Sequence, residues 1–565
     1  MNNHILHKKH SFKNIRELIE WAGNEHGNKI AYSFRKKPSD KQIKKISYTV
    51  FRNDVRNMSS TLASMGCTGK HCAVIGKFSY DWAVMYFSIL SIGGVLVPLD
   101  KEWHTTDLCD TVKRAEAEFL FIDEDAKEKA IAIANTVKLR HEPVYMLSKD
   151  EKMSIKKLVE EGKNKFTADP SLYFDAPIDP FKIALLVFTS GTTGKGKGVM
   201  LSQNAILSDI TDAIPYIDYS DKTISLLPPH HTYGSTVMFA GHTIIGAEIY
   251  ISSGLKYITK ELKEQKPGHL ALVPLYLETF YRRILQTVKD QGKEKLLFRM
   301  IKISNFLRKF GIDLRKKLFR SVRDAFGGEL KTAISGGAPI NPEIMDFFDA
   351  IGISTLNGYG ITECAPLIAF TRSKNIVKGS VGNVIDIDTV LIDKPNEDGE
   401  GEILVKGPNV MIGYYMDEEA TKDAITEDGY FRTGDYGKMD KNGILYITGR
   451  KKNLIILSNG KNVYPEEIEN EFTAIPGVLE IIVYEGQSKR GLEHNAIVAK
   501  IFPDADYFKK NGIEDIQSYF KKHIDDYNRK AVVYKKIAIF KVRNEEFPKN
   551  TLRKIMRFKL DMTID

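Results

Sequence analysis

The stretch Phe188–Val199, FTSGTTGKGKGV, closes a run of apolar residues and combines four glycines with four hydroxyl residues and two lysines. Glycines allow backbone N–H groups to turn toward an anion, and hydroxyl and ammonium groups can bind phosphate oxygens. The stretch therefore predicts a phosphate-binding loop after a buried strand. Two kinds of phosphate loop compete for it, and they imply different chemistry.

The first kind is the P-loop of nucleotide triphosphatases. Gly191–Lys197 fits the first seven positions of GxxxxGK[ST], but Gly198 stands where the hydroxyl for magnesium is required. A P-loop lysine opens a helix, whereas here the strand-like Val199–Leu201 follows and a helix cap appears only at Ser202. We therefore expect a strand–loop–strand device. Six of its residues are expected to face the phosphates: Thr189, Ser190, Gly191, Thr192, Thr193 and Lys197.

Size and composition indicate a globular protein with more than one domain. The chain has 565 residues, of which 42% are hydrophobic and 27% charged. Its four cysteines lack CxxC spacing, which argues against a disulfide scaffold or a cysteine-rich zinc site and favours a reducing compartment. The N-terminus has no apolar segment typical of a signal peptide, so we expect none.

One uncharged run, Trp82–Leu99, has the length to suggest a membrane span. However, Gly93, Gly94 and Pro98 interrupt it. A helix that ends at the glycines, followed by a short buried strand at Val95–Leu99, explains the run better than a span does.

The first 350 residues alternate apolar strand-like runs with helical stretches. The runs are CAVIG (72–76), EFLFID (118–123), IALLVF (183–188) and HLALVP (269–274). Such alternation predicts a largely parallel sheet covered on both faces by helices. One of these helices has an apolar face formed by Phe51, Val55, Met58, Leu62 and Met65, and Thr49 is predicted to cap it.

The pattern changes after about residue 390. Short strand-like runs separated by Asp, Asn and Gly turns predict antiparallel pairing there. From Leu454 onward, the order strand, helix, two strands, helix and strand is sufficient for a small α+β domain, with Pro465 in the first turn of its first helix.

Further motifs follow the loop in a recognisable order. They are SGGAP (335–339), NGYGITE (357–363), YFRTGDYG (430–437), GRKKNLI (449–455) and FPKNTLRKIMR (547–557). Together with the glycine-rich loop they resemble the AMP-forming adenylating enzymes, a superfamily that includes acyl-CoA synthetases, firefly-type luciferases and peptide-synthetase adenylation domains. Within it, the chain most resembles the long-chain fatty acyl-CoA synthetases.

The resemblance implies that two of these motifs bind ATP around its adenine. The residues concerned are Gly337, Ala338, Pro339, Asn357, Gly358, Tyr359, Gly360 and Ile361. It also implies that Thr362 meets the α-phosphate and that Glu363 binds Mg²⁺. The residue types suit these roles, because a tyrosine ring offers a stacking face and a carboxylate beside phosphates requires a cation. Without this context, Glu363 would be interpreted as a solvated surface acid.

The later motifs carry the remaining implied roles. Asp435 would accept hydrogen bonds from both ribose hydroxyls, because an ionised carboxylate accepts two at once. Arg450 would contact the ribose and phosphates, and Lys452 would be the hinge of a moving C-terminal domain. Three residues follow in the SNGKN segment: Ser458 and Gly460 at the CoA site, and Lys461 near the nucleotide.

Lys554 falls on the family's catalytic lysine. An ammonium between the attacking carboxylate and the α-phosphate reduces their repulsion and stabilises the transition state. Two residues depart from the family pattern, Gly196 where proline is common and Arg553 where glycine is usual. His231, in LLPPHHTYG (226–234), is the candidate beside the acyl carboxylate, with Tyr233 as a pocket wall; a partly buried turn histidine is the alternative.

The segment 293–323 contains eleven lysines and arginines against two acids. Leu296, Met300, Ile303, Leu307 and Phe310 form a stripe at helical spacing. One interpretation is a basic amphipathic helix that lies on an anionic membrane and receives fatty acid there. The other is a helix whose stripe packs on the domain while its charges face water. Because the charge is confined to this segment, nucleic acid is not an expected partner.

Together these observations predict an α/β protein. A large N-terminal adenylating domain of several subdomains (1–451), with parallel-rich sheets covered by helices, is followed by a small mobile α+β domain (452–565). The expected activity joins a carboxylic acid, chiefly a medium- or long-chain fatty acid, to CoA with ATP and Mg²⁺, releasing AMP and pyrophosphate. The alternatives are a ligase that loads an acyl carrier protein, a P-loop kinase, and a non-catalytic nucleotide-binding protein. We expect a cytoplasmic protein, and contact with the inner membrane face is left open.

Overall fold

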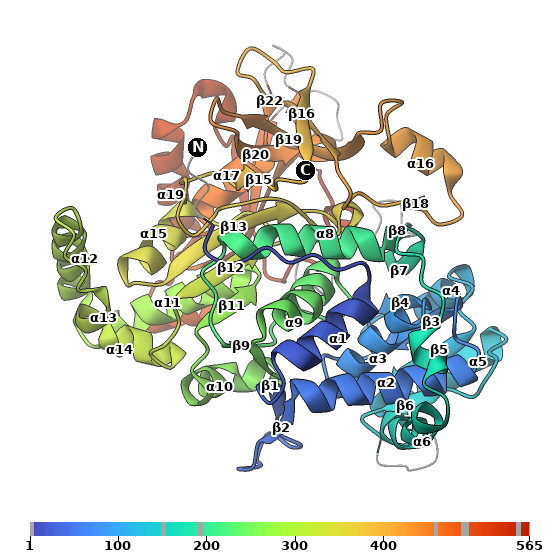
Figure 1. Cartoon of the computed structure of the whole chain (residues 1–565). Helices are drawn as coiled ribbons and strands as arrows, with labels where there is room; N and C mark the ends of the chain where they lie inside the picture. Colours follow the sequence, from blue (N-terminus) through green and yellow to red (C-terminus); the bar gives the residue numbers. More distant parts are fainter. Residues whose placement is uncertain are drawn as a thin grey trace.

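The computed structural model of the chain places two large β-sheets, covered by helices, beside a smaller C-terminal body (Figure 1). The structure describes residues 5–148, 154–189, 196–456, 462–486, 496–549 and 555–563. This arrangement confirms the predicted α/β fold class.

The first large sheet comes mainly from the N-terminal part of the chain and has the strand order β18-β8-β7-β4-β3-β5-β6. Its strands are β3 (His71–Ile75), β4 (Val95–Leu99), β5 (Phe119–Asp123), β6 (Val144–Met146), β7 (Ile183–Phe188), β8 (Gly198–Ser202) and β18 (Gly413–Tyr414). Strands β3 to β7 run parallel, whereas β7 and β8 pair antiparallel. Because parallel strands end at one edge of a sheet, the loop after β7 lies at the edge where β3 and β4 also end.

Helices cover both faces of this sheet. On one face lie α1 (Ile15–Glu25), α2 (Tyr48–Ser64) and α3 (Tyr80–Ser91), and on the other α4 (Thr105–Arg114) and α5 (Lys127–Thr136). Alternate strand residues point to opposite faces, so that Cys72 and Val74 belong to one core and Ala73 and Ile75 to the other. Helices α6 (Ile155–Ala168) and α7 (Ser171–Phe174) pack against α2.

The predicted apolar face of α2 is buried, but its predicted cap is wrong. Ser47 has extended backbone geometry, and its hydroxyl accepts a hydrogen bond from the Val50 N–H at 3.3 Å. Thr49 lies inside the first turn instead. The helix begins earlier than the sequence indicated because Tyr48 is itself a buried helical residue.

The run Trp82–Leu99 folds as predicted, into helix α3 followed by the fully buried strand β4. Of the helices that the structure describes, none is both long and apolar enough to cross a bilayer.

The second large sheet has the order β11-β12-β13-β14-β15-β20-β19-β17-β16. Its strands are β11 (His269–Leu272), β12 (Thr332–Gly336), β13 (Ser354–Gly360), β14 (Leu367–Phe370), β15 (Gly382–Val384), β16 (Thr389–Asp393), β17 (Gly401–Lys406), β19 (Phe431–Met439) and β20 (Ile444–Arg450). Strands β11, β12 and β13 run parallel, and the pairs from β13 to β16 are antiparallel, as predicted after residue 390. Helices α10 (Ile258–Gln265), α11 (Pro274–Asp290) and α15 (Pro342–Ala350) pack on its parallel end.

A smaller sheet joins the two halves, in the order β2 (Lys44–Ser47), β1 (Ile30–Phe34), β10 (Glu248–Tyr250) and β9 (Lys222–Ile224). Helix α8 (Gln203–Ala213) starts at Ser202, whose hydroxyl accepts from the Ala205 N–H, so this predicted cap is confirmed. A π-helix at Tyr233–Gly241 continues directly into α9 (His242–Ile245).

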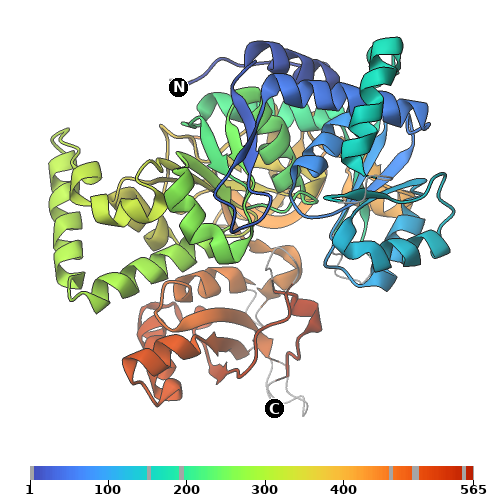
Figure 2. The ribbon, with the colours of Figure 1, turned by 90° about the horizontal axis from the view of Figure 1, so that it is seen from below.

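The chain after residue 454 forms its own core. Its strands are β21 (Ile455–Ile456), β22 (Asn462–Val463), β23 (Val478–Gly486), β24 (Ala496–Pro503) and β25 (Ile539–Val542), and its helices are α17 (Pro465–Phe472), α18 (Ala505–Asn511) and α19 (Ile516–Lys530). Figure 2 shows this body set against the underside of the rest. It contains the predicted small α+β arrangement, with one more short strand and two helices where one was expected.

A few polar contacts join this body to the remainder. The Arg282 side chain on α11 donates to the Val478 carbonyl at 2.9 Å, and Asn341 before α15 donates to the Asn470 carbonyl at 2.8 Å. Lys289 donates to Asn511 at 2.6 Å. Lys510 also forms an ion pair with Asp290, and α17 packs against β20. A mainly polar interface between two bodies separates more readily than a continuous apolar core.

Residues 293–323, called the arm from here on, project from the side of the molecule (Figures 1 and 2). The arm consists of α12 (Glu294–Arg308), α13 (Arg315–Leu318) and α14 (Arg320–Arg323). The interpretation that its apolar stripe packs on the domain holds only in part, because Met300 packs against the core and Leu307 is half-buried while the other three members are exposed. Leu297 and Ser304 are the buried residues of α12, while Leu296, Ile303 and Phe310 are exposed.

Two buried histidines, His242 at the start of α9 and His269 at the start of β11, lie in contact with each other. His242 Nε2 lies 2.9 Å from His269 Nε2, His242 Nδ1 lies 2.7 Å from the Val237 carbonyl, and the Ser220 N–H donates to His269 Nδ1. These partners suit two neutral rings, with His269 donating to His242. Burial lowers the pKa of His242 to about 4 and that of His269 well below its ordinary value.

Acid should therefore weaken the fold through this pair. Below pH 6.5 these two histidines bind protons in the unfolded chain but stay neutral in the folded protein. The free energy of unfolding therefore falls as the pH drops from 6.5 toward 4, by on the order of 3 kcal/mol from His242. Urea unfolding between pH 6.5 and 4 should show a smaller loss in the free energy of unfolding for His242→Gln/His269→Gln than for the wild type. His141→Gln, which changes an exposed ring, is the control. Equal pH slopes for all three proteins would contradict the assignment.

Candidate active site

The glycine-rich loop connects two strands, as the sequence indicated, and these strands pair antiparallel. Phe188 at the end of β7 stands opposite Gly198 at the start of β8. The Thr189 N–H donates to the Lys197 carbonyl at 3.0 Å and closes the base of the loop. Four predicted phosphate contacts lie outside the described residues: Ser190, Gly191, Thr192 and Thr193. The strand–loop–strand prediction is correct in the part of the loop that the structure describes.

Lys197 stands at the start of a chain of contacts that leads to Glu363. Its ammonium lies 4.6 Å from the centre of the Tyr414 ring, and the Tyr414 hydroxyl donates to Glu363 Oε1 at 3.0 Å. The Met411 N–H donates to the Glu363 carbonyl at 2.7 Å, which fixes the backbone of this residue. A cation, an aromatic hydroxyl and a carboxylate thus meet beside the phosphate loop.

The two predicted adenine segments leave neighbouring parallel strands at the same edge. Ser335 on β12 stands opposite Asn357 on β13, and Gly336 stands opposite Gly358. Beyond β12 the chain turns through Gly337, whose φ of +85° favours glycine. Ala338 and Pro339 after it are exposed and so accessible to a ligand.

Asn357 is tied to the scaffold. Its N–H donates to Thr371 Oγ1 at 2.6 Å, and its side-chain amide donates to the Ser380 carbonyl at 3.2 Å. A side chain already engaged in this way holds strand β13 in place. Its predicted contact with ATP stays a prediction.

Tyr359, Asp435 and Arg450 form a second chain of contacts. The Tyr359 hydroxyl donates to Asp435 Oδ2 at 2.9 Å, and Arg450 Nε lies 3.1 Å from Asp435 Oδ1. Asp435 on β19 stands opposite Arg450 on β20, so strand register fixes this ion pair. Asp435 raises the pKa of Arg450, and burial raises the pKa of the Tyr359 hydroxyl. Motifs 76 residues apart in sequence are joined here by one carboxylate.

The turn after β13 carries the predicted catalytic residues Thr362 and Glu363. The Ile361 N–H donates to the Pro366 carbonyl at 2.8 Å and closes the turn, and Thr362 is nearly buried. Gly360 lies against it so closely that an added Cβ would stand 1.9 Å from the Pro366 oxygen. Backbone crowds this position, so the turn requires glycine.

Gly360→Ala should therefore damage activity more than folding. The methyl group must displace the turn that holds Thr362 and Glu363, and a shift of about 1 Å in such groups can cost about a hundredfold in rate. Steady-state kinetics with ATP and Mg²⁺ measures the loss, and urea unfolding measures the cost to the fold. Activity close to that of the wild type would show that the turn can move without consequence.

Glu363 has the chemistry of a magnesium ligand that acts together with a substrate. Burial raises the pKa of its carboxyl, with the Tyr414 hydrogen bond opposing this effect. Across the described ranges, no three His, Cys, Asp or Glu side chains gather into a cluster able to hold a metal. Mg²⁺ is commonly held by one or two carboxylates together with substrate phosphates, so a single carboxylate beside the phosphate loop fits it.

His231 lies in the turn before the π-helix. Its Nδ1 accepts a hydrogen bond from the Tyr233 N–H at 3.2 Å, and the Tyr233 hydroxyl donates to the Ile334 carbonyl at 2.8 Å. The Tyr233 ring lies 3.3 Å from where a Cβ on Gly336 would stand, so it flanks the first adenine segment. These contacts give the His231 side chain a defined orientation. They leave its predicted role beside the acyl carboxylate a proposal.

The C-terminal candidates are only partly within the described chain. Lys452 lies in a single 3-10 turn, Lys451–Asn453, between β20 and β21. Ser458, Gly460 and Lys461 lie outside the described residues, and so does Lys554. Beside the latter, Lys549 and Ile555 form an isolated antiparallel bridge.

Sequence reasoning missed several residues that complete the site. Tyr414, which binds Glu363, comes from a strand that pairs with β8. Arg114 on α4 donates to the Gly196 carbonyl at 2.6 Å and steadies the loop. His230 lies 3.6 Å from Asp100, at the end of β4. No local motif marks these residues, although GYY at 413–415 shortly after the adenine segments was a signal available for Tyr414.

The family assignment rests on a match over most of the chain. The profile of the AMP-binding enzyme family matches residues 19–415. This chain belongs to the AMP-binding enzyme family. The match includes the glycine-rich loop, both adenine segments and Tyr414, and it confirms the resemblance seen in the motifs.

Relatives of this AMP-binding enzyme are ligases of fatty acids. A long-chain-fatty-acid–CoA ligase of Mycobacterium bovis is 29% identical over 453 residues, covering 76% of this chain and 74% of its own. A chloroplastic long-chain-fatty-acid–[acyl-carrier-protein] ligase of Arabidopsis thaliana is 26% identical, covering 85% and 76%. The ATP-bound crystal structure of MatB from Rhodopseudomonas palustris has the same fold, with a TM-score of 0.74 at 23% identity over 96% of this chain and 97% of that one.

Proposed function

We propose that this protein is an AMP-forming acyl-CoA synthetase that joins a long-chain fatty acid to CoA at the expense of ATP. The observation that carries the proposal is that two contact chains, one from each large sheet, reach the turn after β13, where Tyr359 and Glu363 lie four residues apart. The Tyr359–Asp435–Arg450 chain suits a nucleoside, and the Lys197–Tyr414–Glu363 chain suits phosphates with their cation. The similarity to fatty-acid ligases supports the acid as substrate.

In the first half-reaction, the fatty-acid carboxylate attacks the α-phosphorus of ATP and pyrophosphate leaves. In this proposal Arg450 and Asp435 hold the ribose end, and Thr362, which is nearly buried next to Glu363, donates to the α-phosphate. Glu363 would hold Mg²⁺, which offsets the negative charge on the phosphates. Lys554 brings an ammonium to the attacking carboxylate. These groups act by position and charge, and none of them forms a covalent bond with substrate.

In the second half-reaction, the CoA thiol attacks the acyl carbonyl and AMP leaves. We propose that the domain formed by residues 452–565 first rotates about Lys452, so that Lys554 withdraws and CoA enters near Ser458 and Gly460. The separate core after residue 454 and the few polar contacts across the boundary support such a movement.

The protein is further proposed to be cytoplasmic and to associate with a bilayer only peripherally. All four cysteines are free, and three of them are buried, which agrees with a reducing compartment. Long-chain fatty acids reside in bilayers, so an enzyme that acts on them benefits from contact with a lipid surface.

A panel of carboxylic acids from acetate to stearate tests the proposal. Purified protein with ATP, Mg²⁺ and CoA should release AMP and pyrophosphate in equal amounts, most rapidly with long chains. Holo-acyl carrier protein in place of CoA tests the acceptor found in the Arabidopsis relative. Release of ADP and phosphate with every acid would refute the reaction.

A further inference from the structure

Large apolar side chains are exposed on the arm at a density unlike the rest of the molecule. Of the 23 that are exposed among the described residues, seven lie within 296–314, so this short segment holds nearly a third of them. They are Leu296, Phe298, Ile303, Phe306, Phe310, Ile312 and Leu314. Contiguous exposed apolar surface of this kind marks an interaction site more often than single scattered residues do.

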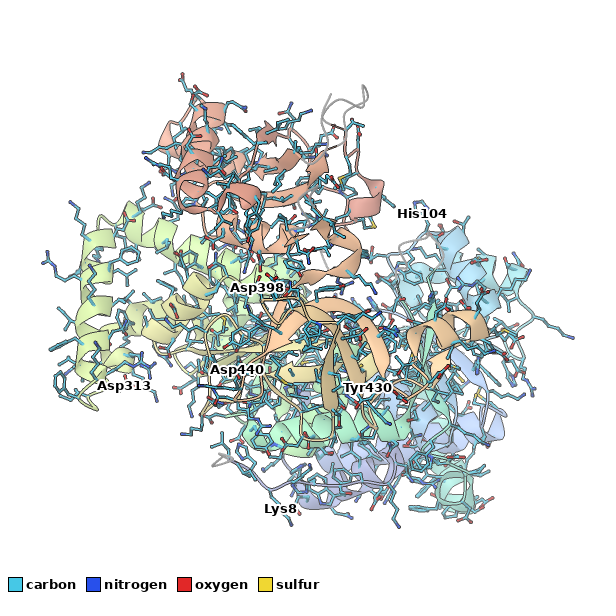
Figure 3. The ribbon with its side chains drawn as sticks, turned by 90° about the horizontal axis from the view of Figure 1, so that it is seen from above. Lys8, His104, Asp313, Asp398, Tyr430 and Asp440 are labelled. Carbon is cyan, nitrogen blue, oxygen red and sulfur yellow. The ribbon has the colours of Figure 1, made fainter. Side chains whose placement is uncertain are left out.

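The arm is attached to the rest of the molecule by its opposite face. Arg308 and Arg315 both form ion pairs with Asp349 of α15, at 2.7 and 3.1 Å, and Leu297 and Ser304 are buried. The exposed face is therefore a fixed surface of the folded molecule. Figure 3 places Asp313, at the turn after α12, at the outer end of the arm.

Two parallel rows of side chains lie on that exposed face. Leu296, Ile303 and Phe310 repeat every seven residues, with 50%, 50% and 67% of each exposed. Phe306 lies beside the row, with its ring 5.2 Å from that of Phe310. Residues seven apart fall almost above one another on a helix, so Leu296 and Ile303 lie about 10 Å apart along α12, and Phe310 follows two residues after the helix ends.

The second row is cationic and lies about 100° further round the helix from the first, because successive helical residues are turned by that angle. Lys295, Lys302 and Lys309 each precede a member of the apolar row by one residue, and Arg299 lies between them. All four are exposed, and none of them pairs with an acid in the described part of the chain. The ion-paired arginines belong to the opposite, anchored face.

We propose that the arm docks on an anionic phospholipid bilayer, with the apolar row in the outer acyl region and the lysine row at the headgroups. A helix with a straight apolar row beside a cationic one has the form of an interfacial helix. Nucleic acid would leave the apolar row uncovered. A second copy of the arm would bring like charges together, which opposes pairing.

The arm reaches the active site through a single helix. Helix α11 starts directly after β11 and runs for about 25 Å to the base of the arm. Val273, just before it, lies beside Gly337 of the adenine segment. Docking could deliver a fatty acid from the bilayer to the active site, and this role rests on the proposed function. The docking itself does not depend on that function.

Vesicle co-sedimentation without ATP or CoA tests the docking. The wild type should bind vesicles containing phosphatidylglycerol, bind pure phosphatidylcholine vesicles weakly, and dissociate as salt increases. Lys295→Gln/Lys302→Gln/Lys309→Gln should weaken binding on the order of a hundredfold, since each lysine near the surface contributes about fivefold. Leu296→Gln/Ile303→Gln/Phe310→Gln should weaken it at least as clearly, because the inserting row is lost.

Matched controls are exposed residues of the same type elsewhere. Lys256→Gln/Lys422→Gln/Lys441→Gln removes three exposed lysines, and Ile131→Gln/Leu255→Gln/Phe181→Gln removes apolar side chains that are 52%, 59% and 67% exposed. Both controls should bind vesicles as the wild type does. If arm and control variants bind alike, the proposal is overturned. It is also overturned if the apolar arm variant binds normally but turns a dimer into a monomer in light scattering.

Activity separates this inference from the proposed function. The apolar arm variant should keep wild-type turnover of a short, water-dissolved acid and lose turnover of a fatty acid presented in vesicles. Vesicle binding by a protein that activates no acid would refute the synthetase and leave docking intact. Full activity of the variant on vesicle-borne fatty acid would refute delivery through the arm.

Discussion

Lys554→Ala is expected to abolish measurable adenylate formation and to spare the transfer of a supplied acyl-adenylate to CoA. The ammonium is required where a carboxylate approaches a negatively charged phosphate, and removing a positioned charge of this kind costs about 10²–10³ in rate. The thioester step has no such encounter, because its electrophile is an acyl carbonyl. Pyrophosphate–ATP exchange measures the first step, and thioester formation from synthetic adenylate measures the second.

Lys530→Ala is the matched control for this experiment. Lys530 is an exposed lysine at the end of α19 in the same C-terminal body. Its removal changes the charge equally and should leave both steps intact. A parallel loss of both steps in Lys554→Ala would mean that the residue supports the body as a whole, and the division of labour between the two half-reactions would fail.

Asp435→Asn raises the KM for ATP strongly and also lowers stability. The carboxylate, which is 3% exposed, accepts from Tyr359 and pairs with Arg450. The asparagine amide has one acceptor oxygen, and its NH₂ group would face either the Tyr359 hydroxyl or the Arg450 side chain, which are both donors. Each hydrogen bond to a charged group contributes about 1.5–3 kcal/mol, so the loss of one corresponds to about tenfold to hundredfold in binding. Steady-state kinetics and urea unfolding measure the two effects.

A double-mutant cycle with Tyr359→Phe identifies the contact responsible. Because the two residues share one hydrogen bond, the effect of removing the hydroxyl should be much smaller once Asp435 is asparagine. Asp440→Asn, in the exposed turn of the same β19–β20 hairpin (Figure 3), is the control and should leave the KM for ATP unchanged. Additive effects of Tyr359→Phe and Asp435→Asn would argue against the contact chain as the nucleoside site.

The choice between a P-loop and a strand–loop–strand shows where sequence reasoning succeeds. Gly198 in place of a hydroxyl and the strand-like residues after it predicted a hairpin, and β7 and β8 form one. The signal was local, since backbone geometry and strand patterning act over a few residues. The same is true of the helix–strand reading of Trp82–Leu99 and of the cap at Ser202.

Predictions that depended on distant partners were weaker. Thr49 was preferred as a cap because its hydroxyl suits the position, but burial of Tyr48 moved the start of α2 back to Ser47. The stripe Leu296–Phe310 left two interpretations open, a packing face and a membrane face, because its spacing alone does not show what covers it. Which face of α12 is anchored depends on Asp349, some forty residues later in the chain.

By itself, the sequence determined the order of motifs, the glycine-rich hairpin and the change from alternating to antiparallel segments. These follow from residue types whose backbone and phosphate-binding preferences act locally. Only the tertiary structure decided that Tyr359, Asp435 and Arg450 share a carboxylate, that Tyr414 holds Glu363, and that the apolar row of the arm faces outward. Strand register and helix anchoring set those contacts, and both depend on packing between segments far apart in the chain.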